Sequence, residues 1–153
     1  MKRISIIIPI VLLLLTMVFI GCEEIPELSE GFGIYDSSVE LNGVYPGWKD
    51  TIPLTIVNGN DRDRLFAVSI KSPSKVKDGF EAFPKEYFYW ITIPESEVSI
   101  LAGKTYQIPI ILAIPKDTDY SDKHAEVRIL VEDITQLGLV QVALEAKWFI
   151  ITK

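Results

Sequence analysis

Two places in the chain carry residue types that can do acid–base or nucleophilic chemistry. His124 is the only histidine among the 153 residues, and a general base needs a nucleophile within hydrogen-bond reach. Ser72 and Lys75 have the Ser-x-x-Lys spacing of lysine-activated serine nucleophiles, but Pro73 interrupts the segment and no Lys-Thr-Gly follows. We therefore expect His124 at the start of a strand, Ser72 and Lys75 in a loop, and no catalytic residue or cofactor. The protein is predicted not to be an enzyme.

Two segments rich in oxygen ligands, residues 58–64 and 115–122, are the candidates for Ca²⁺, which binds carboxylate and carbonyl oxygens. In NGNDRDR, the alternating positions are Asn, Asn and Arg, and the cation of Arg62 spoils the third ligand, although Asp61 and Asp63 remain available. The carboxylates of the second segment, PKDTDYSD, are Asp117, Asp119 and Asp122. Polar turns explain both segments, so no metal site is predicted, and calcium stays an alternative.

Cys22 is the only cysteine, and it directly follows a long apolar segment. Two cations, Lys2 and Arg3, precede 18 residues without charge, residues 4–21, which is typical of a secretory signal peptide. As a helix, this segment would be roughly 27 Å long, which is close to the thickness of a hydrocarbon core. A retained transmembrane anchor is therefore the alternative to a cleaved signal peptide.

The residues VFIGC, at 18–22, resemble the lipobox of bacterial lipoproteins, in which a small residue precedes a lipid-modified cysteine. Gly21 occupies the small position. The resemblance implies cleavage before Cys22, a diacylglyceryl thioether on its sulfur, and an acyl group such as palmitate on the new N-terminus. Several acyl chains anchor a protein stably where one chain would not. We expect residues 1–21 to be the signal peptide, and residues 22–31 to be the lipidated cysteine and a short acidic tether.

The 132 residues after the leader are enough for one domain and too few for two. Since the leader carries two of the 15 basic residues and none of the acidic ones, this part has 13 basic and 21 acidic residues, a net charge near −8. Phosphate binding needs clustered cations, so nucleic acid is excluded as a partner. With Cys22 lipidated no thiol remains, and apolar burial alone must hold the domain together.

Beyond residue 31, short segments of period-2 alternation are separated by turn residues, which predicts strands with one buried face. The seven predicted strands lie in FGIYDSSVEL (32–41), DTIPLTIVN (50–58), LFAVSIK (65–71), EYFYWITIP (86–94), TYQIPIILAIP (105–115), AEVRILVE (125–132) and LVQVALEAKWFIIT (139–152). Pro53 and Pro109 lie inside strand patterns and indicate edge strands or bulges, because proline cannot donate to the ladder. The expected fold is an all-β, immunoglobulin-like antiparallel β-sandwich of about seven strands over residues 32–153, preceded by a signal or anchor helix.

Three segments, YPGWKDTIPLTIVNGND, WITIPESEVSILAGKTYQIPIILAIP and AEVRILVE, are similar to a recurrent immunoglobulin-like module of bacterial and archaeal surface proteins. The shared features are a Pro-Gly turn before a strand ending in Asn, a Trp-containing strand, a Leu-Ala-Gly turn and a strand closing on Pro. The residues that match are Pro46, Gly47, Asn58, Trp90, Pro94, Leu101, Ala102, Gly103 and Pro115. The resemblance covers roughly residues 33–151, and it implies a non-catalytic spacer, adhesive module or assembly part.

The densest aromatic segment, residues 80–90, is the candidate binding surface. As a strand it would place Tyr87 and Tyr89 together on one face. An exposed tyrosine pair can serve a protein interface or stack on sugar rings, whereas packing beneath the preceding loop is the alternative. The other candidates of the same kind, around the Pro-Gly turn, are Tyr45 and Trp48.

These observations predict an exported, non-catalytic binding or structural module. A lipid anchors it to the cell membrane or to a periplasmic or external face of the outer membrane, and it takes part in a cell-envelope assembly with a protein partner. Two alternatives remain: a module that binds envelope glycan, and a single-pass transmembrane-anchored sandwich subunit of an envelope or filament-base complex. The residues that carry these predictions are Cys22 for lipidation and Tyr45, Trp48, Tyr87 and Tyr89 for binding.

Overall fold

The computed structural model describes residues 31–135 and 142–153. The predicted signal peptide or anchor helix, Cys22 and nearly all of the tether lie outside the described residues. Within the described part, no helix has the length and hydropathy needed to cross a bilayer.

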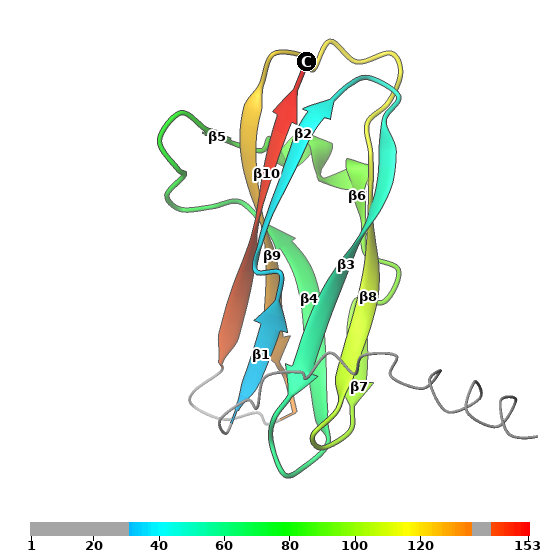
Figure 1. Ribbon diagram of the computed structural model, residues 1–153, viewed down its shortest axis with the longest axis vertical. Helices are drawn as coiled ribbons and strands as arrows, with labels where there is room; N and C mark the ends of the chain where they lie inside the picture. The colour runs from blue at the N-terminus through cyan, green and yellow to red at the C-terminus, as the bar shows by residue number, and fades with distance from the viewer. Residues whose placement is uncertain (1–30, 136–141) are drawn as a thin grey trace, which may run out of the picture.

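Two β-sheets packed face to face form the described domain (Figure 1). The four-stranded sheet has the order β1 (Phe32–Tyr35), β3 (Lys49–Asn58), β8 (Thr105–Ala113), β6 (Ile91–Thr92). The six-stranded sheet has the order β2 (Ser38–Val44), β10 (Ala143–Thr152), β9 (His124–Asp133), β4 (Arg64–Lys71), β7 (Glu97–Ile100), and β5 (Glu81–Ala82) also pairs with β9. A 3-10 helix, η1 (Lys85–Trp90), lies between β5 and β6. The predicted all-β sandwich is confirmed. The described residues form ten strands where about seven were predicted, because residues 32–41 divide into β1 and β2, and the short strands β5 and β7 were not predicted.

The core lies between the sheets and is built from the alternating residues of the long strands, as the period-2 pattern predicts. The buried residues of β3, β8, β9 and β10 that form its centre are Ile52, Leu54, Ile56, Ile108, Ile110, Leu112, Ala125, Val127, Ile129, Val131, Ala146, Trp148 and Ile150. Burying one large aliphatic side chain stabilises a fold by about 1.5–3 kcal/mol. Because the described part contains no cysteine, this burial is its main source of stability.

The segment that begins the domain leaves one sheet and joins the other. β1 runs antiparallel to β3, and β2 then runs parallel to β10, with Ser38 opposite Lys147. Between the two strands Asp36 has a φ of 56°, in the left-handed region that Asp and Asn tolerate better than most residues. The prediction of a purely antiparallel sandwich is therefore wrong, since β2–β10 and the short β5–β9 pair are parallel.

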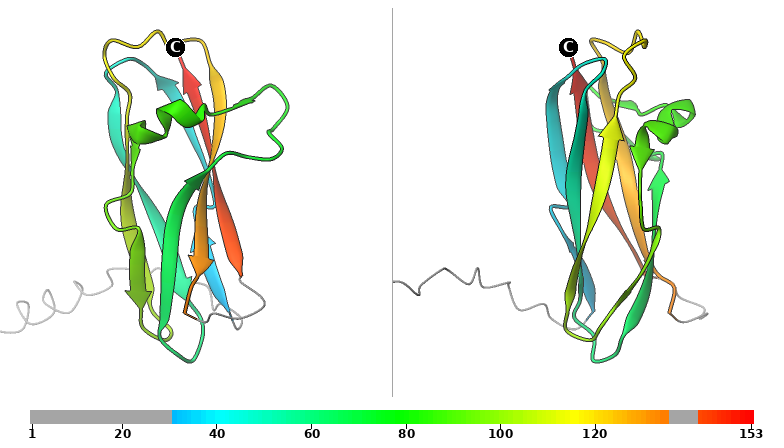
Figure 2. Two further views of the ribbon diagram at one scale, coloured as in Figure 1. Left: turned by 180° about the vertical axis from the view of Figure 1, so that it is seen from behind. Right: turned by 90° about the vertical axis from the view of Figure 1, so that its right-hand side faces the viewer.

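Residues 85–90 form a 3-10 helix where the alternating pattern predicted a strand. Pro84 is the N-cap residue, with a φ of −60° and an extended ψ of 135°, and its carbonyl accepts a hydrogen bond of 3.0 Å from the backbone N–H of Tyr87. The helix connects β5, which pairs with β9, to β6, which pairs with β8, so the segment crosses from one sheet to the other (Figure 2). Phe83 and Trp90 are 0% and 3% exposed at the two ends of this crossing. The burial of these two rings explains why the segment does not follow its strand-like pattern.

Pro53 and Pro109 lie opposite each other in the β3–β8 pair, in the middle of the four-stranded sheet. The prediction that these prolines lie on edge strands is correct only at the prolines themselves, because β3 and β8 are central strands elsewhere along their length. β1 pairs with β3 over residues 55–58, and β6 pairs with β8 at residues 111–112, so at each proline the described strands leave the outer side open. A proline at such a position costs no ladder hydrogen bond and hinders the addition of another strand.

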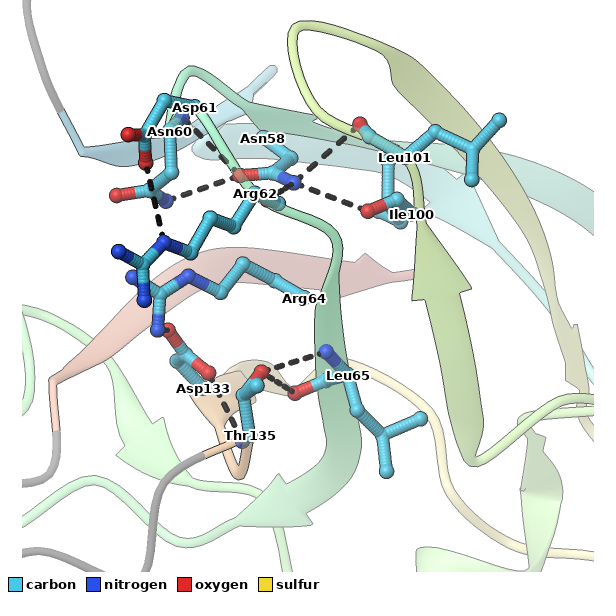
Figure 3. Close-up of polar contacts among 10 residues, drawn as sticks. All are labelled: Asn58, Asn60, Asp61, Arg62, Arg64, Leu65, Ile100, Leu101, Asp133 and Thr135. Atoms are coloured by element: carbon cyan, nitrogen blue, oxygen red, sulfur yellow. Dashed lines mark hydrogen bonds and ion pairs between the residues drawn. The ribbon is translucent and has the colours of Figure 1, made fainter.

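One end of the sandwich is organised by Asn58, which is fully buried (Figure 3). Its side-chain amide donates hydrogen bonds to the backbone carbonyls of Arg62 and Ile100, at 2.8 and 2.9 Å. Its Oδ1 atom accepts a hydrogen bond of 3.1 Å from the backbone N–H of Asn60. Asn58 therefore holds its own turn in shape and ties that turn to the end of β7.

Two further contacts at this end join the start of β4 to the end of β9 (Figure 3). Arg64 forms an ion pair with Asp133 at 3.5 Å, and the backbone N–H of Leu65 donates to Thr135 Oγ1 at 2.7 Å. Side-chain contacts thus link β4 and β9 at this end, in addition to the main-chain hydrogen bonds between the paired strands.

We expect the substitution Asn58→Ala to lower the free energy of unfolding by about 2–4 kcal/mol, because the part-buried carbonyl of Arg62 and the buried carbonyl of Ile100 would lose their donor. Chemical denaturation of the purified protein measures the change. The matched control is Asn42→Ala, which removes an exposed amide that donates to Glu40 and should change the free energy by less than about 0.5 kcal/mol. Equal losses in the two variants would contradict the structural role of Asn58.

Candidate protein-binding surfaces

His124 lies at the start of β9, and Ser72 and Lys75 lie in the loop between β4 and β5, as the sequence predicts. The imidazole of His124 is exposed and packs on the ring of Phe80, with centroids 5.5 Å apart. Among the described residues, no hydrogen bond joins His124 to a serine or an acid.

The two oxygen-rich segments are polar turns. Within residues 31–135 and 142–153, no group of three or more His, Cys, Asp or Glu side chains is placed to hold a metal ion. In residues 58–64, Asp63 Oδ1 accepts a hydrogen bond of 2.9 Å from the backbone N–H of Ala102. In residues 115–122, Tyr120 is buried in the core.

The aromatic cluster around η1 is mainly a packing feature. Tyr87 stacks on Trp90 with ring centroids 4.2 Å apart and an angle of 10° between the planes. Phe83 and Tyr120 meet the Trp90 ring edge-on, at 5.9 and 5.5 Å. Such aromatic pairs contribute about 0.5–1.5 kcal/mol each beyond the area that they bury. Tyr87 therefore belongs to the support of the sandwich and offers little free surface.

Tyr89 is the exposed ring of this segment, with 72% of the residue accessible. Its plane stands at 81° to the plane of Trp90, on which Tyr87 lies almost flat, so the two tyrosine rings are roughly perpendicular. The glycan alternative requires an exposed, coplanar pair on which sugar rings can stack. Tyr87 and Tyr89 do not form such a pair, and only Tyr89 can contact a partner freely.

Tyr45 and Trp48 flank the turn between β2 and β3, at the end of the sandwich opposite to Asn58. The backbone N–H of Trp48 donates to the carbonyl of Tyr45 at 2.9 Å, and Gly47 between them has a φ of 89°, which glycine adopts without strain. Trp48 packs against the core, whereas Tyr45 is 55% exposed. In each predicted pair, one ring supports the fold and one reaches solvent.

Two polar atoms of the aromatic cluster, Trp90 Nε1 and the Tyr120 hydroxyl, are buried without a hydrogen-bond partner among the described residues. Burial, and after it the nearby charge of Glu81, raises the pKa of Tyr120 far above its usual range. The phenol therefore stays neutral at physiological pH, and ring contacts hold it in the cluster.

The long open edge of the six-stranded sheet is β2. The backbone N–H of Lys147 donates to the carbonyl of Ser37 at 2.7 Å, so in this parallel pair the alternate residues of β2 direct their N–H and C=O groups away from β10. The residues that point outward in this way are Ser38, Glu40 and Asn42. No described strand covers this side, and β2 contains no proline, in contrast to the open stretches of β3 and β8. β2 is therefore the edge best suited to accept another strand.

No protein-family model and no curated protein matches the chain. Solved structures with similar folds exist. The periplasmic chaperone SfaE superposes with a TM-score of 0.57 at 16% identity, over 80% of this chain and 58% of that chain. PapD-like domain 7 of human CEP192 gives a TM-score of 0.57 at 12% identity, over 82% of this chain and 90% of that chain. The Salmonella enterica SafA pilin–SafB chaperone complex gives 0.56 at 10% identity, over 82% and 56%.

At such low sequence identity, these similarities show the fold of this chain and nothing about its function. The chain spans a little over half of the two chaperone-related chains and most of the CEP192 domain. The fold is a PapD-like immunoglobulin sandwich, which confirms the predicted immunoglobulin-like architecture.

We expect Tyr87→Ala to lower the free energy of unfolding by about 2 kcal/mol, because the stack on Trp90 and part of the core cover would be lost. Tyr89→Ala is the matched control, since it makes the same side-chain change two residues away at an exposed position, and it should cost less than about 0.5 kcal/mol. Urea denaturation followed by tryptophan fluorescence measures both. A larger loss in Tyr89→Ala would contradict the assignment of Tyr87 to the core.

Proposed function

We propose that the protein is a membrane-anchored, non-catalytic immunoglobulin-like module that binds a protein partner in an assembly of the cell envelope. Residues 1–21 act as the signal peptide, Cys22 carries the lipid, and residues 22–31 form the tether to the domain at 32–153. The resemblance to a lipobox and the apolar segment before Cys22 support export and anchoring.

The observation that carries the binding role is the open edge of β2. A strand of a partner can extend the six-stranded sheet there through main-chain hydrogen bonds, and alternate side chains of that strand supply specificity. The same addition to the four-stranded sheet is opposed by Pro53 and Pro109. Strand addition is therefore directed to one of the two sheets.

The similarity in fold to envelope chaperones supports a protein partner. The SafB chaperone is found in complex with the SafA pilin, and the Acinetobacter baumannii protein CsuC is found with the tip adhesion subunit CsuE in a pre-assembly complex. These are partners of those proteins, and we infer from the shared fold only that this chain also binds protein.

The attachment point limits where the partner can be. Phe32 lies opposite Asn58, so the tether joins the domain at the end that Figure 3 shows. The nine residues 23–31 reach at most about 30 Å when extended. The Asn58 end therefore stays close to the membrane, and the partner is a membrane-proximal protein.

We expect Glu40→Pro to abolish capture of the partner, because it removes an outward N–H of β2 and leaves the hydrogen bonds to β10 intact. The measurement is in-cell crosslinking followed by purification of the detergent-solubilised protein and identification of what is recovered with it. Glu40→Gln is the matched control: it removes the charge, keeps the N–H, and should retain the partner. Recovery of the same partner in equal amount with a folded Glu40→Pro variant would rule out strand addition at β2.

For the anchor, we expect the natural protein to have lost 21 residues and to have gained acyl mass on Cys22. Intact mass spectrometry of the protein extracted from membranes measures both changes. Cys22→Ser should keep the leader and take up no labelled palmitate, because the thioether cannot form. A natural protein of 153 residues whose membrane attachment is unchanged by Cys22→Ser would instead identify a transmembrane anchor.

A further inference from the structure

The loop of residues 72–80, between β4 and β5, projects from the side of the sandwich beside β9 and β10 (Figure 1). Together with the outer face of these strands it forms an open hollow of about 350 Å³, hereafter the cationic hollow. The side chains that line it and bear on its chemistry are Lys75, Lys77, Glu126, Arg128, Lys147 and Phe149.

Aromatic rings hold one of these cations in place. The Nζ atom of Lys77 lies 4.8 Å from the ring centroid of Phe149 and 5.2 Å from that of Phe80. The two rings contact each other edge-on at 5.1 Å. An ammonium group is attracted to the faces of aromatic rings, so Lys77 is fixed at the hollow while its charge remains available.

Of the lining residues only Glu126 is acidic, and its charge is used inside the protein. Glu126 is 1% exposed; its Oε2 atom accepts a hydrogen bond of 2.7 Å from the backbone N–H of Lys77, and its Oε1 atom pairs with Arg128. A buried carboxylate requires such partners. Glu126 therefore fixes the loop and the guanidinium, and it does not neutralise the lysines around the hollow.

The lysines are the free charges of the site. Arg128 is shared between Glu126, Glu145 and the backbone carbonyl of Lys75. In the part of the chain that the structure describes, neither Lys75 nor Lys147 has a carboxylate within ion-pair distance. The hollow thus collects unpaired positive charge on a protein whose net charge is −6. Local charge of opposite sign to the whole molecule favours an anionic ligand at this place.

We propose that the cationic hollow binds the carboxylates of an acidic segment of the protein partner, an inference that rests on the proposed binding function. Lysine ammonium groups are separate point charges that suit single carboxylates, whereas a planar arginine fork free for two phosphate oxygens is absent because Arg128 is engaged. Two apolar residues, Val76 and Phe149, also line the hollow beside the charges, which suits a peptide in which acidic and apolar residues alternate.

The strand register connects the hollow with the open edge of β2. Lys147 lies opposite Ser38, and Phe149 lies opposite Glu40. A strand added to β2 would be two strand spacings, about 10 Å, from β10. Long acidic side chains on the outer face of such a strand therefore come near Lys147, so one extended segment of the partner reaches both features.

The test uses the purified full-length protein in detergent and a fluorescein-labelled peptide in which glutamate and leucine alternate. Fluorescence anisotropy measures the dissociation constant. The double variant Lys75→Glu/Lys147→Glu should weaken binding by about ten-fold or more, and Lys75→Gln/Lys147→Gln by a smaller factor. The matched control, Lys49→Glu/Lys104→Glu, makes the same change in net charge at exposed lysines that do not line the hollow, and should change binding less than about two-fold.

Equal losses in the two glutamate double variants would show a response to net charge alone and overturn the proposal. No binding of the peptide by the unsubstituted protein would also overturn it. So would equally strong competition by inorganic phosphate or by anionic phospholipid added to the detergent micelles, which would assign the hollow to phosphate. These results concern the hollow only, because the peptide is added directly. Capture of a cellular partner and its loss in Glu40→Pro test the binding function separately.

Discussion

The sandwich depends on segments that leave one sheet and join the other. Residues 32–44 do so on one side by way of the turn at Asp36, and residues 81–100 do so on the other through β5, η1, β6 and β7. Two stacked sheets would otherwise expose their core along both sides. The crossings also decide which edges remain open, because β1 and β6 cover only the ends of β3 and β8, while β2 covers β10 and becomes an edge itself.

The long strands could be predicted from the sequence because each has one face in the core, and β3, β8, β9 and β10 show it as clear alternation. β5, β6 and β7 have two to four residues, which is too short for a period to appear. Residues 85–90 alternate like a strand, yet ring burial between the sheets, a tertiary effect, makes them helical. The parallel pair of Ser38 with Lys147 joins distant parts of the chain, and no local pattern records it.

The candidate sites were less predictable than the long strands, because they too depend on contacts between distant parts of the chain. The sequence singled out four aromatic residues, but alternation cannot tell which ring of a pair a helix or turn directs inward, and only Tyr45 and Tyr89 are strongly exposed. No sequence pattern predicts the cationic hollow, because the folded loop is what brings Lys75 and Lys77 close to Lys147. The residue related to it in the sequence is Glu126, which lies at an outward position of a predicted strand. Its carboxylate becomes buried only because the loop covers it.

The outer faces of the two sheets differ in charge, and the packing of the core does not require this difference. The outward residues of β3 and β8 between positions 51 and 55 and between 107 and 111 are Thr51, Pro53, Thr55, Gln107, Pro109 and Ile111, without a charge among them. The outward residues at the centre of the six-stranded sheet include Lys71, Arg128, Glu145 and Lys147, and Glu145 forms ion pairs with Lys71 and Arg128. Both faces cover the same kind of apolar interior, so folding alone does not account for the contrast. Free charge and an open, proline-free edge occur together on the six-stranded sheet, so the recognition role that we propose falls on that sheet and the four-stranded sheet supports it.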